Sequence, residues 1–338
     1  MPLKPYIQAA LSGKDLNERS AHEAMGHVMR GEATPAQIAA WLVALRLKRE
    51  TLEEIVGFAE SMRAAMVSLP DAPEGAIDTC GTGGDGLGTF NISTTAALIA
   101  ASCGVPVAKH GNRSVSSPSG SADVLEALGL TTELDPAQAS GTLTETGFVF
   151  LFAPRFHPAM RHAAAPRHEI AVRTVFNLLG PLCNPARVRR QIVGVYDRSR
   201  LMQIAEVLRA LGAEKAMVIS GPNGADELLP IGDNLIVEWD GSTFKEYTLR
   251  AESVGVPECV LDQVRGGNAQ DNAEIIWQIA DGHGGPKTET ALLNAGAALY
   301  VARRAASIAE GVQIAREAVR SGRLAEFLRR IIPGNQER

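Results

Sequence analysis

Two polar loops in this 338-residue chain contain residues suited to binding a phosphorylated ligand. The first is glycine-rich, runs from Asp78 to Gly86 after a predicted strand, and leads to Asn91, Ser93 and Thr94 at the start of an alanine-rich predicted helix. Free backbone N–H groups and the positive end of a helix dipole favour an anion at such a position. The pattern predicts a phosphate or diphosphate site, and an ordinary glycine-rich connection with a helix cap is the alternative.

The same glycines formally satisfy a dinucleotide-binding pattern, because Gly81, Gly83 and Gly86 fit G-x-G-x-x-G. A dinucleotide fold also needs the helix to open at the glycines and an acid about 20 residues further on. Here the predicted helix begins only near Ser93, and positions 100–107 contain no acid. The pattern therefore does not indicate a nicotinamide cofactor.

The second loop runs from Lys109 to Ser117 and continues to Asp123, and it combines two cations with several hydroxyls. In a parallel sheet, consecutive strands deliver their C-terminal loops to the same edge, so we expect this loop to lie beside the glycine loop. Lysine, arginine and hydroxyl groups in two converging loops suit a multiply phosphorylated ligand. A solvated polar loop is the alternative interpretation.

Two neighbouring carboxylates, Asp226 and Glu227, follow another predicted strand. Mg²⁺ takes one or two protein carboxylates and completes its coordination with water and substrate phosphates. An Asp-Glu pair is common on protein surfaces, so only the two phosphate-seeking loops favour a metal site here.

Composition excludes several classes of protein. Hydrophobic residues make up 45% and the net charge is −5, which opposes a general nucleic-acid binder because phosphate neutralisation requires excess Lys and Arg. The four cysteines are far apart with no CxxC pair, which favours a reducing cytoplasm over a disulfide framework. We find neither a secretory signal nor an apolar run long enough for a membrane span, and we expect a cytoplasmic protein.

The elements that must position these residues fall into two parts. Residues 1–70 predict helices, with capping boxes at Thr34 and Thr51; part of 155–190, a Pro-rich basic segment, is expected to join this helical domain. Residues 71–338 predict an α/β domain with a mostly parallel central sheet flanked by helices. The expected strands are 76–80, 105–108, 148–152, 191–195, 215–219 and 234–238, and the expected helices include 93–103, 120–128, 201–211 and segments within 290–330.

Several motifs, in order along nearly the whole chain, resemble the anthranilate phosphoribosyltransferase family. They are G-T-G-G-D at 81–85, N-I-S-T at 91–94, K-H-G-N-R at 109–113, S-G-S-A-D at 119–123, R-T-V-F-N-L-L-G-P-L-C-N-P at 173–185 and L-N-A at 293–295. The resemblance implies transfer of a phosphoribosyl group from 5-phosphoribosyl 1-pyrophosphate (PRPP) to anthranilate in tryptophan biosynthesis, with Mg²⁺ as cofactor. It also implies a homodimer that forms through the helical domain.

The resemblance assigns roles to individual positions. It implies a catalytic set of Lys109, Arg167 and Asn112, and metal ligands at Ser93, Asp226 and Glu227. The implied PRPP-binding residues are Gly81, Gly84, Asp85, Thr89, Asn91, Ile92, Ser93, Thr94, Lys109, His110, Gly111, Asn112, Arg113, Ser114, Val115, Ser116, Ser117 and Ser121. The implied anthranilate-binding residues are Gly81, Asn112, Arg167, His110, His157 and Pro181.

The chain departs from the family pattern at two places. Ser220 stands where a histidine is common before the metal-binding acids, and Ala171 stands where a glycine usually precedes the R-T-x-F-N run. Three alternatives stay open: a pyrimidine nucleoside phosphorylase-like enzyme, a paralogous phosphoribosyltransferase with another acceptor, and a catalytically silent paralogue that binds nucleic acid.

Overall fold

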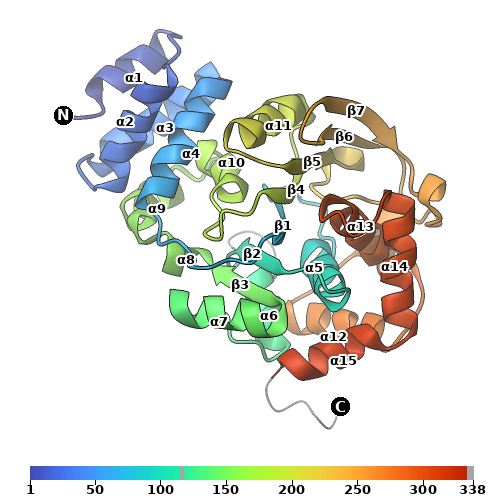
Figure 1. Ribbon diagram of the computed structural model, residues 1–338. Coiled ribbons are helices and arrows are strands. Elements are labelled where there is room, and N and C mark those ends of the chain that lie inside the picture. Colours follow the sequence, from blue (N-terminus) through green and yellow to red (C-terminus); the bar gives the residue numbers. More distant parts are fainter. Residues whose placement is uncertain (115–117, 333–338) are drawn as a thin grey trace.

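The computed structural model describes residues 1–114 and 118–332, and it contains a small helical part beside a larger α/β part (Figure 1). The helical part begins with α1 (Lys4–Leu11), α2 (Glu18–Met29), α3 (Pro35–Lys48) and α4 (Leu52–Ala65). Three later helices are α8 (Ala153–Phe156), α9 (Arg161–Ile170) and α10 (Val175–Leu182). Of these, α9 packs against α2 and α3, while α10 packs against α3 and α4.

The helix starts predicted from capping boxes are confirmed. The Thr34 hydroxyl accepts a hydrogen bond from the Gln37 N–H at 3.3 Å, and the Thr51 hydroxyl accepts one from the Glu54 N–H at 3.3 Å. Each cap satisfies a backbone donor that the first turn of a helix would otherwise leave free. Among the described residues, no helix is both long enough and apolar enough to span a membrane.

The larger part is built on a seven-stranded sheet with the order β3-β2-β1-β4-β5-β6-β7. All pairs from β3 to β5 are parallel, and β6 and β7 extend the sheet in antiparallel fashion. The predicted α/β class with a mostly parallel sheet is therefore confirmed. The strands are β1 (Ile77–Gly81), β2 (Val107–Gly111), β3 (Phe148–Phe152), β4 (Arg190–Gly194), β5 (Lys215–Ser220), β6 (Asn234–Trp239) and β7 (Phe244–Leu249).

Helices cover both faces of the sheet. In β3, three phenylalanines face one hydrophobic core while Val149 and Leu151 face another, as expected for a strand buried on both sides. The first core lies between the sheet and α5 (Ile92–Ser102), α6 (Ser121–Ala127), α12 (Ala269–Ala280), α13 (Pro286–Val301), α14 (Ile308–Arg320) and α15 (Arg323–Ile331). The opposite face is covered by α7 (Pro136–Thr146) at β3 and by α11 (Leu201–Ala210) at β5 and β6.

The order in which strands are added to the sheet reverses between β1 and β4, although these two strands are parallel. From β1 the chain proceeds to β2 and β3 on one side, and from β4 to β5 on the other. A crevice forms at such a switch point, outside the carboxyl ends of the parallel strands. The segments after β1, β2, β4 and β5 therefore all leave the sheet at one edge.

Candidate active site

The three polar segments predicted from the sequence meet at this edge. The Gly83 N–H, after β1, donates to Oδ2 of Asp226 at 2.6 Å, and the Ser93 N–H, in the first turn of α5, donates to Oε1 of Glu227 at 3.0 Å. Nζ of Lys109, from β2, donates to the Ser93 hydroxyl at 3.3 Å. The predicted convergence of the loops is thus confirmed. The N–H of Ser93, expected to be free for an anion, is instead bound by a carboxylate.

Lys109 lies in a different setting from the one predicted. The sequence placed it in a loop after the strand, but β2 continues through Gly111 and pairs with β3, so Lys109 lies within the sheet. Only 2% of its surface is exposed, and its Nζ also donates to the Thr79 carbonyl at 2.6 Å. Because Lys109 belongs to a paired strand, its ammonium group is held at the start of α5 more firmly than it would be in a flexible loop.

The two acids form a compact anionic centre. Gly81 permits this geometry, because a Cβ at that position would overlap Oδ2 of Asp226. Burial, followed by the negative charges of nearby acids, raises the pKa of both Asp226 and Glu227. Ser220, which departs from the family pattern, is fully buried at the end of β5, and both acids still reach the glycine loop and α5.

Asp123 closes the second predicted loop. One of its oxygens, Oδ2, accepts hydrogen bonds from the N–H groups of Ser114 at 3.0 Å and of Gly120 at 2.8 Å, which brings the two ends of the loop together. Three residues assigned to PRPP by resemblance, Val115, Ser116 and Ser117, lie between these ends and outside the described residues.

The guanidinium of Arg113, which the resemblance assigns to PRPP, is bound by acids in this structure. Its guanidinium donates to both carboxylate oxygens of Glu126 at 2.6 Å, contacts Asp123 at 3.4 Å, and lies 5.4 Å from the centre of the Phe152 ring. The guanidinium also contacts Glu133 at 3.4 Å, and a cation held by three acids and a ring is already neutralised. The structure therefore gives Arg113 a role in anchoring the loop to α6.

Several of the predicted PRPP residues hold the loops in place. The Thr94 side chain is fully buried, and its hydroxyl donates to Oδ1 of Asn91 at 3.3 Å. The Asn91 N–H donates to Oδ1 of Asn272 at 3.0 Å, and the Ser121 hydroxyl donates to the Asn112 carbonyl at 3.4 Å. Asn272, a residue without a clear sequence signal, connects α12 to this edge.

Two predicted anthranilate residues, His110 and His157, lie together. Their ring centres are 5.1 Å apart, and Nε2 of His157 lies 2.9 Å from the Cys183 carbonyl. Nε2 of His110 is buried and has no hydrogen-bond partner among the described residues. Burial is the main cause that lowers the pKa of His110 to about 3 and that of His157 to about 4. Both rings are therefore neutral at pH 7.

Arg167 presents a cation to this region. Its guanidinium carbon lies 5.0 Å from the centre of the Phe176 ring, and burial lowers its pKa. Within residues 1–114 and 118–332, no carboxylate forms an ion pair with it. A partly buried guanidinium without a carboxylate is suited to bind one from a ligand.

The buried histidines predict a specific dependence of stability on pH. An unfolded chain protonates His157 near pH 6.5, whereas the folded chain does so only near pH 4, so the folded state loses stability as the pH falls through this interval. From pH 6.5 to 5 the loss is about 2 kcal/mol. In His157→Gln the amide can still donate to the Cys183 carbonyl but takes up no proton. Urea unfolding should therefore show the variant gaining about this much relative to wild type at pH 5.

His168→Gln provides the control, because His168 is exposed on α9. Its unfolding free energy should follow that of wild type at both pH values. A constant difference between His157→Gln and wild type across the pH range would contradict a neutral buried His157.

Sequence reasoning missed two groups that shape the site. Asp78, fully buried in β1, accepts from Nδ2 of Asn184 at 2.8 Å and from the His110 N–H at 3.3 Å, which fixes the relative positions of β1 and β2. Arg173 contacts the glycine loop directly through the carbonyl of Gly83. Asn184 and Arg173 both belong to the long motif at 173–185, so the motif contained a signal to which no role was assigned.

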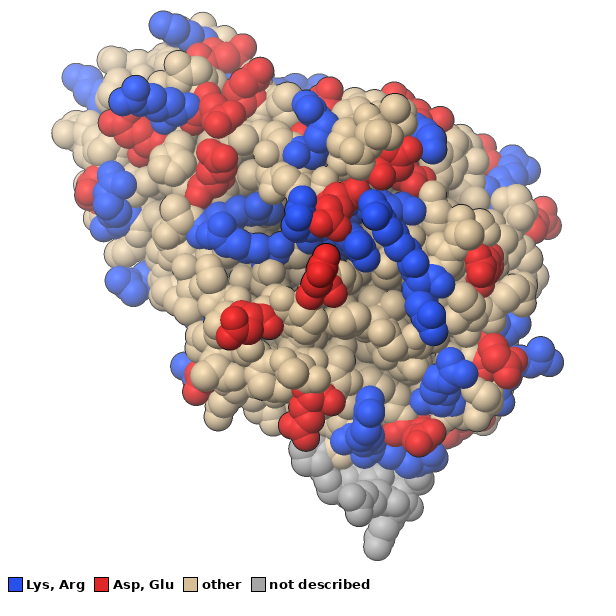
Figure 2. Space-filling view, viewed as in Figure 1, with Lys and Arg blue, Asp and Glu red and all other residues tan. Residues whose placement is uncertain are grey.

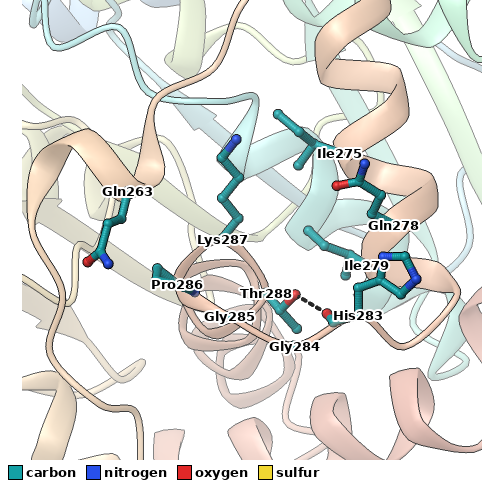
Figure 3. Close-up of a pocket in the computed structure, with 10 residues that line it drawn as sticks. All are labelled: Gln263, Ile275, Gln278, Ile279, His283, Gly284, Gly285, Pro286, Lys287 and Thr288. Carbon is teal, nitrogen blue, oxygen red and sulfur yellow. Dashed lines mark hydrogen bonds between the residues drawn. The ribbon is translucent and has the colours of Figure 1, made fainter.

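A hollow of about 170 Å³ lies outside this site. It lies between α12, the turn before α13, the first turn of α13 and the segment 261–264, and its lining includes Gln263, Gln278 and Lys287 (Figure 3). None of the predicted site residues lines it.

Figure 2 shows Lys and Arg side chains gathered in a band across the middle of one face of the molecule, although the net charge is negative.

Comparisons with known proteins match both parts of the chain. A "Glycosyl transferase family, helical bundle domain" matches residues 4–66, and a "Glycosyl transferase family, a/b domain" matches residues 73–325. Anthranilate phosphoribosyltransferase of Brevibacillus brevis is 50% identical over 331 residues, which covers 97% of each chain.

Solved structures give the same result. The chain superimposes on anthranilate phosphoribosyltransferase from Thermus thermophilus with a TM-score of 0.92 at 44% identity, covering 97% of this chain and 98% of that one. The Saccharomyces cerevisiae enzyme, solved in complex with PRPP and Mg, matches at a TM-score of 0.89 and 26% identity, covering 99% and 98%. That yeast enzyme has also been solved with 4-fluoroanthranilate. The chain therefore belongs to the glycosyl transferase family described by these two domains and, within it, to the anthranilate phosphoribosyltransferases.

Proposed function

We propose that this chain transfers the phosphoribosyl group of PRPP to the amino group of anthranilate, the reaction for which its relatives are named. The bond between the ribose anomeric carbon and the pyrophosphate oxygen breaks, and its electron pair leaves with the pyrophosphate. A bond forms from that carbon to the anthranilate nitrogen, which then gives up a proton to solvent water. The products are N-(5-phosphoribosyl)anthranilate and pyrophosphate, and the reaction is a step of tryptophan biosynthesis.

One observation carries this proposal: three separate segments meet at Ser93, whose hydroxyl accepts a hydrogen bond from Nζ of Lys109 and whose N–H donates to the Glu227 carboxylate. The helix start and the ammonium would attract a diphosphate, while the acids would attract its counter-cation. Arg167, which has no ion-pair partner in the described residues, supplies a place for the anthranilate carboxylate.

The residues present fit Mg²⁺. Asp226 and Glu227 each accept a backbone N–H at one carboxylate oxygen, and these two carboxylates and the Ser93 hydroxyl would hold the metal. The described residues contain no cluster of three or more His, Cys, Asp or Glu side chains arranged around a metal. The protein would thus supply only a few oxygen ligands. This suits Mg²⁺, which completes its coordination with water and substrate phosphate oxygens. When bound there, Mg²⁺ would neutralise charge on the leaving pyrophosphate.

The protein would contribute mainly position and electrostatics. Lys109 and the start of α5 would stabilise the pyrophosphate as it departs, and Arg167 would hold the anthranilate carboxylate so that its amine faces the anomeric carbon. An aromatic amine is neutral at pH 7, and the neutral His110 and His157 offer an uncharged wall for its ring. No strong general base is required.

A direct assay tests the proposal. Purified protein with PRPP and Mg²⁺ should consume anthranilate, followed by loss of its fluorescence, and chelation of the metal with EDTA should stop the reaction. Thymidine phosphorolysis without anthranilate turnover would favour the nucleoside phosphorylase instead. A salt-dependent shift of single-stranded DNA without turnover would favour a nucleic-acid-binding paralogue.

We also propose a homodimer formed through α1 and α3. These helices pack together and expose Leu11 (69%), Leu47 (78%) and Val43 (38%), an unusual set of apolar side chains to leave in water. Val43 and Leu47 are four residues apart and so lie on one face of α3. A second copy of the chain would bury this face.

Leu47→Glu should separate the proposed dimer. A charge at the centre of the interface would lose its hydration on association, so the mass by light scattering should fall from about twice 35.8 kDa to 35.8 kDa. Val260→Glu, at another exposed apolar site, in the α/β domain (61%), should leave the dimer intact. A wild-type chain that elutes as a monomer would refute the interface.

A further inference from the structure

Arg173 joins three segments that come together at the candidate site. Its Nη1 donates to the Gly83 carbonyl at 2.6 Å and its Nη2 donates to the Thr82 carbonyl at 3.1 Å. The Arg173 guanidinium also packs on the Tyr196 ring, whose centre lies 4.2 Å from the guanidinium carbon. One side chain thus holds the glycine loop after β1 against the turn after β4.

The glycine loop depends on this arrangement. A Cβ at Gly84 would overlap Nη1 of Arg173, and Gly84 has φ +78, so the backbone passes the guanidinium in a conformation that favours glycine. The next amide back, the Gly83 N–H, donates to Asp226. Arg173 therefore holds the carbonyl side of the same short loop whose N–H side contacts the proposed metal ligand.

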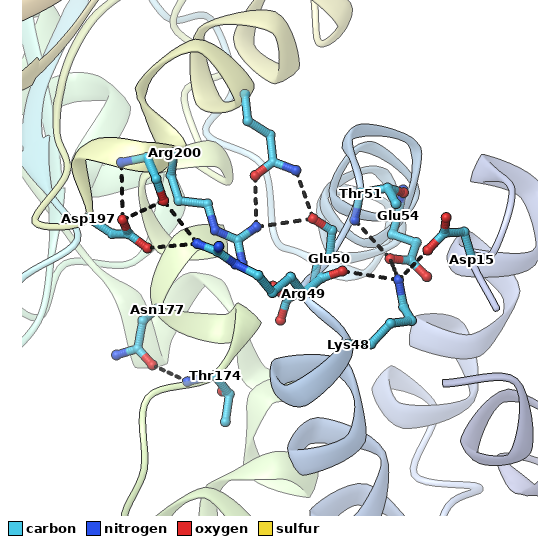
Figure 4. Close-up of polar contacts among 12 residues, drawn as sticks. Asp15, Lys48, Arg49, Glu50, Thr51, Glu54, Thr174, Asn177, Asp197 and Arg200 are labelled. Carbon is cyan, nitrogen blue, oxygen red and sulfur yellow. Dashed lines mark hydrogen bonds and ion pairs between the residues drawn. The ribbon is translucent and has the colours of Figure 1, made fainter. Parts of the chain in front are cut away.

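The turn that carries Tyr196 is in turn fixed to the helical part. Arg200 donates to the Glu50 carboxylate at 2.8 Å and to the Glu50 carbonyl at 3.1 Å, and Arg49 donates to the Ser199 hydroxyl at 2.9 Å (Figure 4). The side chains of Arg200 and Glu50 are only 12% and 3% exposed, so solvent screens this pair weakly. The turn that presents Tyr196 to Arg173 is thus held to the helical part.

Arg173 also follows closely on Arg167 in the chain. Between them Ala171, the departure from the family pattern, takes φ +47, a left-handed conformation that turns the chain out of α9. Residues 167–173 therefore contain both the proposed anthranilate ligand and the residue that contacts the PRPP loop.

We propose that Arg173 is a positioning residue that holds the 82–84 loop in its PRPP-binding shape; this inference rests on the proposed function. Arg173 contacts backbone carbonyls and a ring rather than substrate. A preformed loop binds the diphosphate without first losing conformational freedom, so the effect of Arg173 is expected on donor binding. Because the loop would hold the diphosphate equally before and during bond breakage, its loss should change KM more than kcat.

The test compares Arg173→Met, Arg173→Lys and a matched control, Arg209→Met. Arg209 also lies over an aromatic ring, Phe244, but on α11 and away from the glycine loop. We expect Arg173→Met to raise the KM and the calorimetric Kd for PRPP about tenfold, the effect of losing charged hydrogen bonds. Its kcat and its KM for anthranilate should stay within about twofold of wild type. Arg173→Lys should be intermediate, and Arg209→Met should match wild type.

Hydrogen exchange supplies a readout that needs no substrate. Without ligand, amides 82–88 should exchange faster in Arg173→Met than in wild type or Arg209→Met. Should Arg173→Met fail to fold, Tyr196→Leu, with Tyr196→Phe as its control, applies the same test from the other side of the contact. Unchanged PRPP affinity together with unchanged exchange would overturn the proposal, as would a fall in kcat at constant KM. Inactive wild-type protein would refute the proposed function alone, because the exchange result would still stand.

Discussion

Replacing Arg167 by alanine should raise the KM for anthranilate by at least about a hundredfold, while the KM for PRPP changes less than about threefold. The guanidinium lies over Phe176, partly removed from water, with no competing carboxylate in the described part of the chain. Two charge-assisted hydrogen bonds to a ligand carboxylate contribute about 3–6 kcal/mol under such conditions. Steady-state kinetics with each substrate varied in turn measures the two effects separately.

A substrate without the carboxylate tests whether Arg167 binds that group. Aniline lacks the carboxylate, so wild-type protein should use it poorly, and Arg167→Ala should use it about as well as wild type does. The preference for anthranilate over aniline should therefore collapse in the variant. Arg161→Ala, at an exposed position in the same helix, should leave this preference intact. Equal increases in both KM values for Arg167→Ala would refute a role for Arg167 in binding the acceptor.

Replacing Glu227 by glutamine should lower kcat/KM by about 10² to 10³ and raise the Mg²⁺ concentration needed for half-maximal rate. The amide oxygen can still accept the Ser93 N–H, so the local hydrogen bond is kept while the charge that would attract Mg²⁺ is lost. Asp226→Asn should act in the same direction. A metal titration of the initial rate measures both quantities.

Stability should move in the opposite direction from activity. Burial, followed by the charge of Asp226, raises the pKa of Glu227 to about 8, so the charged form of Glu227 is costly in the metal-free protein and a neutral glutamine avoids that cost. Thermal unfolding in EDTA should therefore give a Tm for Glu227→Gln equal to or above that of wild type. Glu252→Gln, at an exposed acid in the same domain, should change neither rate nor metal dependence. Wild-type metal dependence in Glu227→Gln would exclude Glu227 as a ligand.

Sequence patterns predicted the elements whose signals are local. The capping boxes at Thr34 and Thr51 and the continuous apolar run of 148–152 were recognisable because each signal lies within one turn or one strand. Helix α7 was not predicted, although Asp135 and Gln138 form a capping box at its start. Its interior contains Ser140, Gly141 and Thr142, which have weak helix propensity. The edge strand β7 was missed because it exposes Lys245 and Glu246 and so lacks a buried pattern.

The candidate site shows the same division. Glycines, hydroxyls and acids after successive strands were sufficient to predict that three segments would meet at one sheet edge, since parallel strands present their carboxyl ends together. The sequence placed Lys109 in a loop, whereas pairing with β3 extends the strand through it. Strand length depends on the partner strand, and the partner is distant in sequence.

The sequence by itself determined the class of fold, the residue types at the sheet edge and, through its motifs, the family. Only the tertiary structure decided which side chains those residues meet. It turned Arg113 toward Glu126, left Arg167 without a carboxylate among the described residues, and placed Arg173 between Tyr196 and the glycine loop. All three are arginines, and the residues next to each in sequence do not reveal its partner. Their partners differ because long side chains are oriented by the charges and rings that folding brings within reach, and those contacts join residues far apart in the chain.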